Sequence, residues 1–303
     1  MKKMTTTLRA MINQPGLIVA PGAYDCLTAK IIQEEGFKAL YMTGGGTAVT
    51  HVGRPDLGFI TLTEMAANAR AIASTVNIPV IADADTGFGS ALNAYRTVQE
   101  YERSGVAGLH IEDQILPKQC GHLAGKRVVP ISEMVHKIYG ALEGRTDDDF
   151  VIIARTDALA VTGIDDTLKR CVAYAEAGVD ALFVEAITSR EEVLRVQNEV
   201  DIPLMYNFGE HGKSPLFTHK ELEELSYKLV IYPGSLMFSM CKLAQRVLRE
   251  LKAKGTTEAL MNDMYSPKEF FETMDSQHFQ DLDNKWKAAA DKNFGDEQKG
   301  AIK

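Results

Sequence analysis

The sequence lacks most features that mark secreted, membrane-spanning and nucleic-acid-binding proteins. Its four cysteines are far apart and suggest no disulfide framework. No apolar run approaches the ~18 residues of a membrane-spanning helix, and no apolar stretch follows the two N-terminal lysines, so no signal peptide is expected. Asp and Glu outnumber Lys and Arg by 41 to 33, which argues against nucleic acid and anionic membranes as partners. We therefore expect a protein of the reducing cytoplasm.

A nucleotide-binding loop is also missing. The segment Thr43-Gly44-Gly45-Gly46 is rich in glycine, but no GxGxxG spacing or phosphate-binding lysine accompanies it. Glycines at the end of a strand let backbone N–H groups come close to an anion, as an oxyanion hole requires. This segment therefore predicts binding of a carboxylate or an oxyanion.

Short apolar runs recur along the chain and alternate with segments of helical periodicity. Eight such runs predict a (β/α)8 barrel, the TIM barrel, within the α/β class; the alternative is an open doubly wound sheet. The expected strands cover residues 17–20, 39–42, 79–82, 108–111, 150–154, 181–184, 203–206 and 229–231.

Signals for helix starts and stops support this reading. Thr61–Glu64, Thr188–Glu191 and Thr218–Glu221 have the spacing of capping boxes. Gly36, Gly105 and Gly178 lie where helices would end, and each is followed by an apolar run that reaches a polar residue seven positions later. This shared frame predicts a repeated helix-to-strand unit.

Acidic residues follow two of the expected strands. Asp83 ends the third run, Asp85 lies two positions further on, and Glu112 ends the fourth run. Side chains two residues apart in an extended chain point the same way, and barrel enzymes have their active site at the C-terminal ends of the strands. Carboxylate oxygens suit Mg²⁺, with Mn²⁺ as the alternative ion. The three residues therefore predict a metal site; the alternative is a turn and helix-capping role.

Cys120 differs from the other cysteines in its charged surroundings. It lies in a glycine-containing loop with Lys118 and His122 close in sequence, whereas Cys26, Cys171 and Cys241 fall among apolar helix positions. Nearby cations lower the pKa of a thiol and make it useful in proton transfer. We predict that Cys120 is catalytic, the alternative being a structural thiol.

His122 and Arg155 have two interpretations each. They could anchor a substrate carboxylate at the barrel mouth, or serve as an ordinary histidine and as an ion-pair partner of Asp157. His211 is close to the seventh strand. The remaining histidines, His110 among them, are interpreted as structural.

These segments resemble the isocitrate lyase and phosphoenolpyruvate mutase superfamily, whose signature is Lys-[Lys/Arg]-Cys-Gly-His. The paired acids of residues 83–85 and the loop of residues 118–122 carry the likeness, which runs from about Ala20 to Pro233. The short members typified by 2-methylisocitrate lyase are the most similar. The resemblance implies magnesium held mostly through waters, with Asp85 as the direct ligand.

The resemblance also implies the roles of individual residues. The catalytic residues expected are Lys118, Cys120, His122, Arg155 and Glu112, and the metal-binding residues are Asp83, Asp85 and Glu112. The substrate-binding residues expected are Tyr41, Thr43, Gly44, Gly45, Asp56, Gly121, Arg155, Glu185, Asn207 and Pro233.

The C-terminal segment exceeds what a barrel needs. We expect one domain, residues 1–303, with extra C-terminal helices over about 256–303, the last of them opened by Ser266-Pro267 and a capping-box acid at Glu269. The resemblance implies that the eighth barrel helix is swapped with a neighbouring subunit and that the protein is a homotetramer.

The predicted reaction is a Mg²⁺-dependent carbon–carbon lyase reaction on a 2-hydroxy di- or tricarboxylate. Retro-aldol cleavage would give pyruvate or a similar oxo acid, and Cys120 would protonate the carboxylate-stabilised carbanion. The run after Asn207 lacks the Ser-x-Ser of isocitrate lyases, while Glu210 and Gly212 match methylisocitrate lyases. Four alternatives stay open: 2,3-dimethylmalate lyase or another malate-type lyase, an oxaloacetate hydrolase or decarboxylase, a phosphonate mutase, and a non-catalytic scaffold.

Overall fold

The protein divides into two compact units. The computed structural model describes residues 3–119, 121 and 125–294. The first unit, Met1–Lys242, contains every strand of the described chain, and the second, Leu243–Lys303, contains helices. Among the described residues, no helix is both long enough and apolar enough to cross a lipid bilayer.

The sheet of the first unit is closed. Over the described residues, eight parallel strands pair in chain order, and β8 pairs with β1, so the predicted (β/α)8 barrel is confirmed and the open sheet is excluded. The strands are β1 (Ile18–Ala23), β2 (Leu40–Met42), β3 (Val80–Asp83), β4 (Gly108–Glu112), β5 (Val151–Thr156), β6 (Ala181–Val184), β7 (Leu204–Asn207) and β8 (Leu229–Tyr232).

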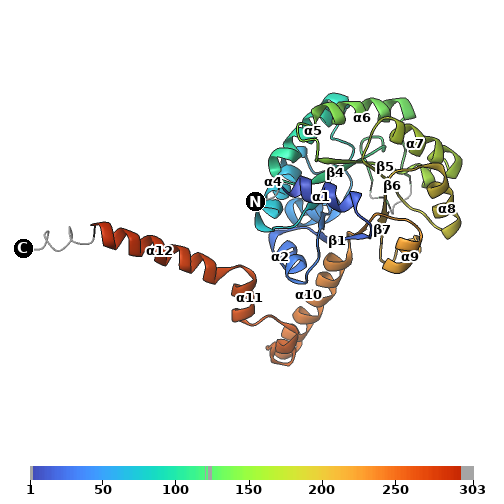
Figure 1. The fold of residues 1–303 in the computed structure, drawn as a ribbon. Helices are drawn as coiled ribbons and strands as arrows, with labels where there is room; N and C mark the ends of the chain where they lie inside the picture. Colours follow the sequence, from blue (N-terminus) through green and yellow to red (C-terminus); the bar gives the residue numbers. More distant parts are fainter. Residues whose placement is uncertain (1–2, 120, 122–124, 295–303) are drawn as a thin grey trace, which may run out of the picture. The chain divides into compact units, whose positions relative to one another are not determined.

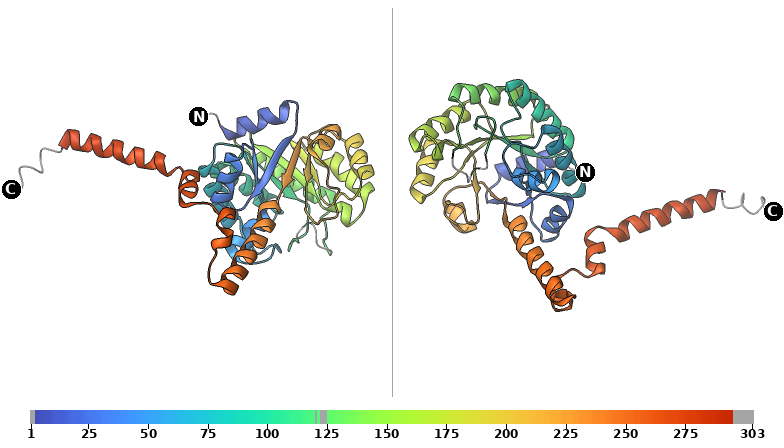
Figure 2. Two further views of the ribbon diagram at one scale, coloured as in Figure 1. Left: turned by 90° about the horizontal axis from the view of Figure 1, so that it is seen from below. Right: turned by 180° about the vertical axis from the view of Figure 1, so that it is seen from behind.

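Helices alternate with the strands around the barrel (Figure 1). The helical segments between the strands are α2 (Cys26–Glu34), α3 (Gly44–Thr47), η1 (Ala48–Val52), α4 (Leu62–Thr75), α5 (Ala91–Ser104), α6 (Ile131–Gly144), η2 (Ala158–Ala160), α7 (Ile164–Glu176), α8 (Arg190–Glu199) and α9 (His219–Glu224). The helix α10 (Ser235–Lys254) follows β8. The side view in Figure 2 shows α1 (Met4–Asn13) at one end of the barrel.

Two apolar cores follow from the period-two alternation of the strands. Outward-facing residues such as Leu109 and Ile152 pack under the surrounding helices. Inward-facing residues such as Ile81 and Ile153 form a second cluster, which Leu8 and Ile12 of α1 close from the end where the strands begin. The opposite end, where the strands finish, is thereby left for polar side chains.

Most of the predicted helix starts and ends are confirmed. The capping boxes at Thr61 and Thr218 are present, and the helix-stop residues Gly36, Gly105 and Gly178 all have positive φ. The box expected at Thr188 is wrong by one residue. Ser189 caps α8 by accepting a hydrogen bond from the backbone N–H of Glu192, because Thr188 itself binds the Glu192 carboxylate from outside the helix.

The second unit consists of the end of α10, η3 (Glu258–Asp263), α11 (Pro267–Thr273) and α12 (Ser276–Phe294). The predicted cap at Ser266 is confirmed, with Glu269 completing the box. No residue of α10 or α12 is buried within this chain. The swapped eighth helix and the homotetramer stay predictions.

Candidate active site

The alternation that builds the inner core also delivers polar side chains to one mouth. The inward positions end in Thr43 after β2, Asp83 on β3, Glu112 on β4, Arg155 on β5 and Asn207 on β7. The register aligns them across the sheet, with Asp83 beside His110 and Glu112 beside Arg155. The same rule explains why Ile81, Ile153 and Met205, two residues earlier, are core residues.

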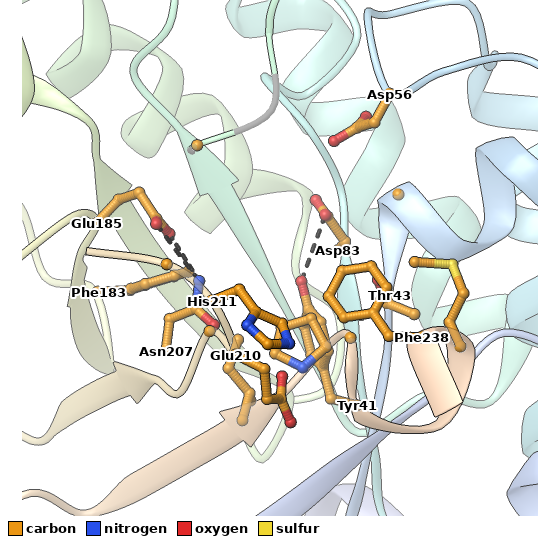
Figure 3. Close-up of a pocket in the computed structure, with 18 of the residues that line it drawn as sticks. Tyr41, Thr43, Asp56, Asp83, Phe183, Glu185, Asn207, Glu210, His211 and Phe238 are labelled. Carbon is orange, nitrogen blue, oxygen red and sulfur yellow. Dashed lines mark hydrogen bonds between the residues drawn. The ribbon is translucent and has the colours of Figure 1, made fainter. Parts of the chain in front are cut away.

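A cavity of about 310 Å³ opens at this mouth (Figure 3). In Figure 3, a hydrogen bond from Tyr41 to Asp83 marks one side of the cavity, and a hydrogen bond from Asn207 to Glu185 marks the other. The predicted substrate-binding residues that line it are Tyr41, Thr43, Gly45, Asp56, Gly121, Arg155, Glu185, Asn207 and Pro233, together with the predicted metal ligand Asp83.

Other predicted residues lie just behind the cavity wall. Asp85, Glu112 and Lys118 are buried, each with at most 3% of its surface exposed. Gly44 lies against Asp83, because a Cβ at position 44 would be 2.4 Å from the Asp83 Oδ2. Cys120 and His122 lie outside the described residues, so their predicted roles stay predictions.

Lys118 connects two acidic residues from different parts of the chain. Its Nζ lies 2.6 Å from the Oδ1 of Asp85 and 2.5 Å from the Oδ1 of Asp56. Burial opposes the charge on Lys118, but Asp85, Glu112 and Asp83 hold the pKa of its ammonium well above the usual range. The lysine therefore stays positive and holds the loop of Asp56 over the paired acids.

The neighbouring cations do not fully offset the cost of burying the acidic side chains of the site. Burial raises the pKa of Asp85 to about 6 despite the opposing effect of Lys118, and Asp83 and Asp56 add to the rise. Burial also raises the pKa of Glu112 well above its usual range, against the effect of Arg155. The Glu112 Oε1 is buried and has no hydrogen-bond partner among the described residues. Both carboxylates would be stabilised by a further cation.

A magnesium ion fits this set of oxygens. Within residues 3–119, 121 and 125–294, no three acidic, histidine or cysteine side chains converge closely enough to hold a metal by themselves. Mg²⁺ usually takes only one or two carboxylates and fills its other positions with water and substrate oxygens. Asp85, with Asp83 and Glu112 close by, suits that mode, and the unpartnered Glu112 oxygen is the observation that favours it.

Arg155 is held by three carboxylates. Its Nε donates to the Oδ2 of Asp157 at 2.9 Å and lies 3.3 Å from the Oε2 of Glu112, and its Nη2 lies 3.5 Å from the Oε2 of Glu185. Both sequence interpretations are therefore compatible, since Arg155 pairs with Asp157 and also lines the cavity. An arginine fixed in this way is preorganised to bind a carboxylate.

Four further residues line the cavity: Glu210, His211, Met237 and Phe238. The sequence draws attention to Glu210 only through the family pattern and to His211 only through its closeness to the seventh strand, and it gives no signal for Met237 and Phe238. These residues lie in the loop after β7 and at the start of α10, beyond the strand ends. His211 has a φ of 61°, which is unusual for a residue other than glycine. The expectation for Cys241 is also wrong: it is exposed, whereas Cys171 is buried and Cys26 is half-buried.

His110, for which the sequence predicts a structural role, is buried inside the barrel next to the site. Its Nε2 is 2.8 Å from the hydroxyl of Tyr41 and 3.7 Å from the Oδ1 of Asp83. Its position one residue before Ile111 puts it on the inward face, two residues before Glu112, which is the pattern that could have identified it.

The buried His110 predicts a loss of stability in acid. Burial lowers its pKa from 6.5 to about 4, although Asp83 opposes this. Between pH 4 and pH 6.5 the unfolded chain therefore binds a proton at this residue that the folded chain does not. The free energy of unfolding is unaffected by this residue above pH 6.5 and decreases as the pH falls towards 4. The size is about 3 kcal/mol at full effect, from about 1.4 kcal/mol per pKa unit.

Thermal melts between pH 7.5 and pH 4.5 test this. His110→Asn should lose less stability over that range than the unmodified chain does, and His136→Asn, at an exposed histidine, should lose as much. Equal slopes for all three proteins would contradict a buried neutral His110.

Comparison with known proteins gives concordant results. A family model described as phosphoenolpyruvate phosphomutase matches residues 8–252. The chain is 42% identical to the 2,3-dimethylmalate lyase of Eubacterium barkeri over 92% of this chain and 96% of that protein. It is also 42% identical to a 2-methylisocitrate lyase of Aeropyrum pernix, over 91% of this chain and 89% of that one.

Solved structures of the same fold also match. An oxaloacetate acetylhydrolase bound to 3,3-difluorooxalacetate has a TM-score of 0.89 and 38% identity, covering 93% of this chain and 96% of that one. A phosphonopyruvate hydrolase in complex with oxalate and Mg²⁺ has a TM-score of 0.84 and 28% identity, covering 97% and 99%.

Proposed function

The chain belongs to the phosphoenolpyruvate mutase and isocitrate lyase superfamily, and from this membership we propose that it is a Mg²⁺-dependent carbon–carbon lyase acting on a 2-hydroxy di- or tricarboxylate. The relatives with these activities are enzymes, so a non-catalytic scaffold is set aside. The products proposed are pyruvate, or a similar 2-oxo acid, and a second carboxylate.

The excess of carboxylates at the mouth carries this proposal. Among the described residues, three cations (Lys118, Lys126 and Arg155) face six carboxylates (Asp56, Asp83, Asp85, Glu112, Asp157 and Glu185). A di- or tricarboxylate brings still more negative charge, and buried charges are tolerated only when paired. A divalent cation would let such an anion bind here. The Mg²⁺ and oxalate of the phosphonopyruvate hydrolase structure support the same arrangement.

Each residue then has a defined task. When bound, Mg²⁺ would withdraw electron density from the substrate oxygens, and Asp85, Asp83 and Glu112 are the residues that would hold it. Arg155 binds a substrate carboxylate. The backbone at Gly45, which lines the cavity, approaches the oxo-acid fragment. In the proposed step, a carboxylate of the site takes the hydroxyl proton as the carbon–carbon bond breaks, and Glu112, whose Oε1 has no hydrogen-bond partner among the described residues, is the candidate base. Cys120 gives its proton to the carbanion of the other fragment.

Apolar side chains in the lining of the cavity favour a substituted substrate. Pro233, Met237 and Phe238 are among the lining residues. An alkyl group on the cleaved molecule would bury apolar surface against these side chains at about 25 cal/mol per Å². We therefore rank 2,3-dimethylmalate and 2-methylisocitrate, the substrates named for two relatives, above unsubstituted isocitrate.

A substrate panel with coupled detection of pyruvate tests the proposal. The panel contains 2,3-dimethylmalate, 2-methylisocitrate, isocitrate, oxaloacetate and phosphonopyruvate. We expect pyruvate or propionate-type products from an alkyl-substituted acid, complete inhibition by EDTA, and recovery with Mg²⁺. Release of oxalate from oxaloacetate alone would instead support a hydrolase, and turnover that survives EDTA would refute the role of the metal.

A further inference from the structure

Asp157 joins two parts of the site that lie apart in the sequence. It follows β5 and is completely buried. Arg155 donates to it twice, from Nε to Oδ2 at 2.9 Å and from Nη2 to Oδ1 at 3.1 Å. Lys126 donates to the same Oδ1 from its Nζ at 2.7 Å. One carboxylate thus pairs with the cavity arginine and with a lysine that follows the Cys120 segment.

Lys126 also contacts the backbone of Gly121. Its Nζ also donates to the carbonyl oxygen of Gly121 at 2.6 Å. Gly121 in turn packs against Arg155, because a Cβ at position 121 would lie 2.6 Å from the Nη2 of Arg155 and 2.7 Å from the Cδ of Glu185. Arg155, Asp157, Lys126 and Gly121 therefore form a closed ring of contacts, which we call the anchor ring.

The barrel holds Asp157 from the other side. Its backbone N–H donates to the Oδ1 of Asp113 at 2.9 Å. The Oδ2 of Asp113 accepts hydrogen bonds from the Thr156 hydroxyl at 2.7 Å, the Tyr174 hydroxyl at 2.9 Å and Arg170 at 3.1 Å. Since Arg170 and Tyr174 belong to α7, the anchor ring is fixed to a helix outside the barrel.

Asp157 is the negatively charged member of the anchor ring and pairs with both of its cations, Arg155 and Lys126. Burial would raise its pKa, but Arg155 and Lys126 hold it below the usual value, so the residue is a carboxylate at neutral pH. Removing Asp157 leaves the buried Lys126 without its carboxylate partner. Removing Lys126 leaves Asp157 paired with Arg155 and breaks the link to the Gly121 carbonyl.

We propose that Asp157 is a positioning residue that fixes the backbone at Gly121 relative to Arg155, acting through Lys126. The inference deepens the proposed function, on which it rests for the role of Cys120, the residue next to Gly121 in sequence. A fixed backbone at this point would hold the proton donor and the carboxylate-binding arginine in one arrangement.

The test measures how fast iodoacetamide alkylates each cysteine, by mass spectrometry of the digested protein. It uses the full-length chain and the variants Lys126→Met, Asp157→Asn and the double variant. Each single change should raise the alkylation rate of Cys120 by ~3–10-fold, because a segment freed from its anchor opens more often. The double variant should match a single one, since both break the same ring.

Internal references and a control variant accompany the measurement. The rates at Cys26 and Cys241 should stay unchanged in every protein, and Asp165→Asn, which removes the carboxylate of the exposed pair with Arg195, should leave Cys120 unchanged. Lys126→Met carries the test by itself if Asp157→Asn does not fold, because the pair of Arg155 and Asp157 persists in it.

Three outcomes would overturn the proposal. Opposite changes in the two single variants would mean that charge, rather than the anchor, affects Cys120, since only Lys126→Met removes a cation. An unchanged rate at Cys120 would mean that the ring does not hold Gly121. A rise at all the cysteines of Lys126→Met would mean that Lys126 supports the whole fold rather than the position of Gly121. The readout needs no substrate, so it is independent of whether the lyase activity is found.

Discussion

Replacing Asp85 by alanine should abolish turnover and leave the barrel folded. Asp85 is buried among Asp83, Glu112 and Lys118, and it is the residue expected to ligate Mg²⁺ directly. A lost direct ligand removes both the metal and the electrostatic stabilisation that it supplies, which the remaining carboxylates cannot replace without their own rearrangement.

The fold should tolerate this change for an electrostatic reason. The pKa of Asp85 is raised to about 6 in the folded protein, mainly by burial. The folded state thus disfavours the charged carboxylate, and this residue opposes folding increasingly as the pH rises from about 4 to 6 and fully above that. At pH 7 we expect the melting temperature of Asp85→Ala to equal or exceed that of the unmodified protein, with Lys118 still paired to Asp56.

Activity, melting temperature and Mg²⁺ binding by calorimetry are the measurements. Asp201→Ala, at an exposed aspartate, is the matched control and should behave as the unmodified chain does. Retained turnover in Asp85→Ala, or Mg²⁺ binding of undiminished affinity, would contradict the assignment of this residue. A collapse of the melting temperature would mean instead that Asp85 is a structural residue.

The strand ends were the most predictable part of the molecule. Each of the eight apolar runs became a strand within three residues of its expected bounds, because a buried parallel strand must be apolar and must alternate its faces. The ends of these strands carry Asp83, Arg155 and Asn207, which line the cavity, and Glu112, which is buried just behind it.

Contacts between loops were not predictable in the same way. The pairing of Lys118 with Asp56 joins residues 62 positions apart, and neither lies on a strand whose direction could be inferred. The sequence suggests Arg155 as a partner for Asp157 but does not reveal the second partner, Lys126. The inward position of His110 does follow from the alternation along β4, but its contact with Tyr41 does not, because Tyr41 is on another strand.

Replacing Cys120 by serine should lower kcat by ~10²–10⁴, the usual contribution of a general acid, with a smaller effect on KM. A hydroxyl is similar in size to a thiol but far less acidic, so it can occupy the place without delivering the proton. In the proposed reaction, Cys120 acts after Arg155 and the metal have bound the substrate, so loss of its proton should affect the chemical step more than binding.

The other cysteines provide the controls for this change. Neither cysteine lines the cavity: Cys241 is exposed, and Cys171 is buried with a pKa raised to about 12 by its burial. Cys241→Ser and Cys171→Ala should therefore leave kcat within about twofold of its original value, given that ordinary substitutions away from a site change little. If all three variants lost activity equally, the thiol at position 120 would be a structural residue. If Cys120→Ser alone kept full kcat, the proton would have to come from another group at the mouth, and the ammonium of Lys118 beside Asp85 would be the first to test.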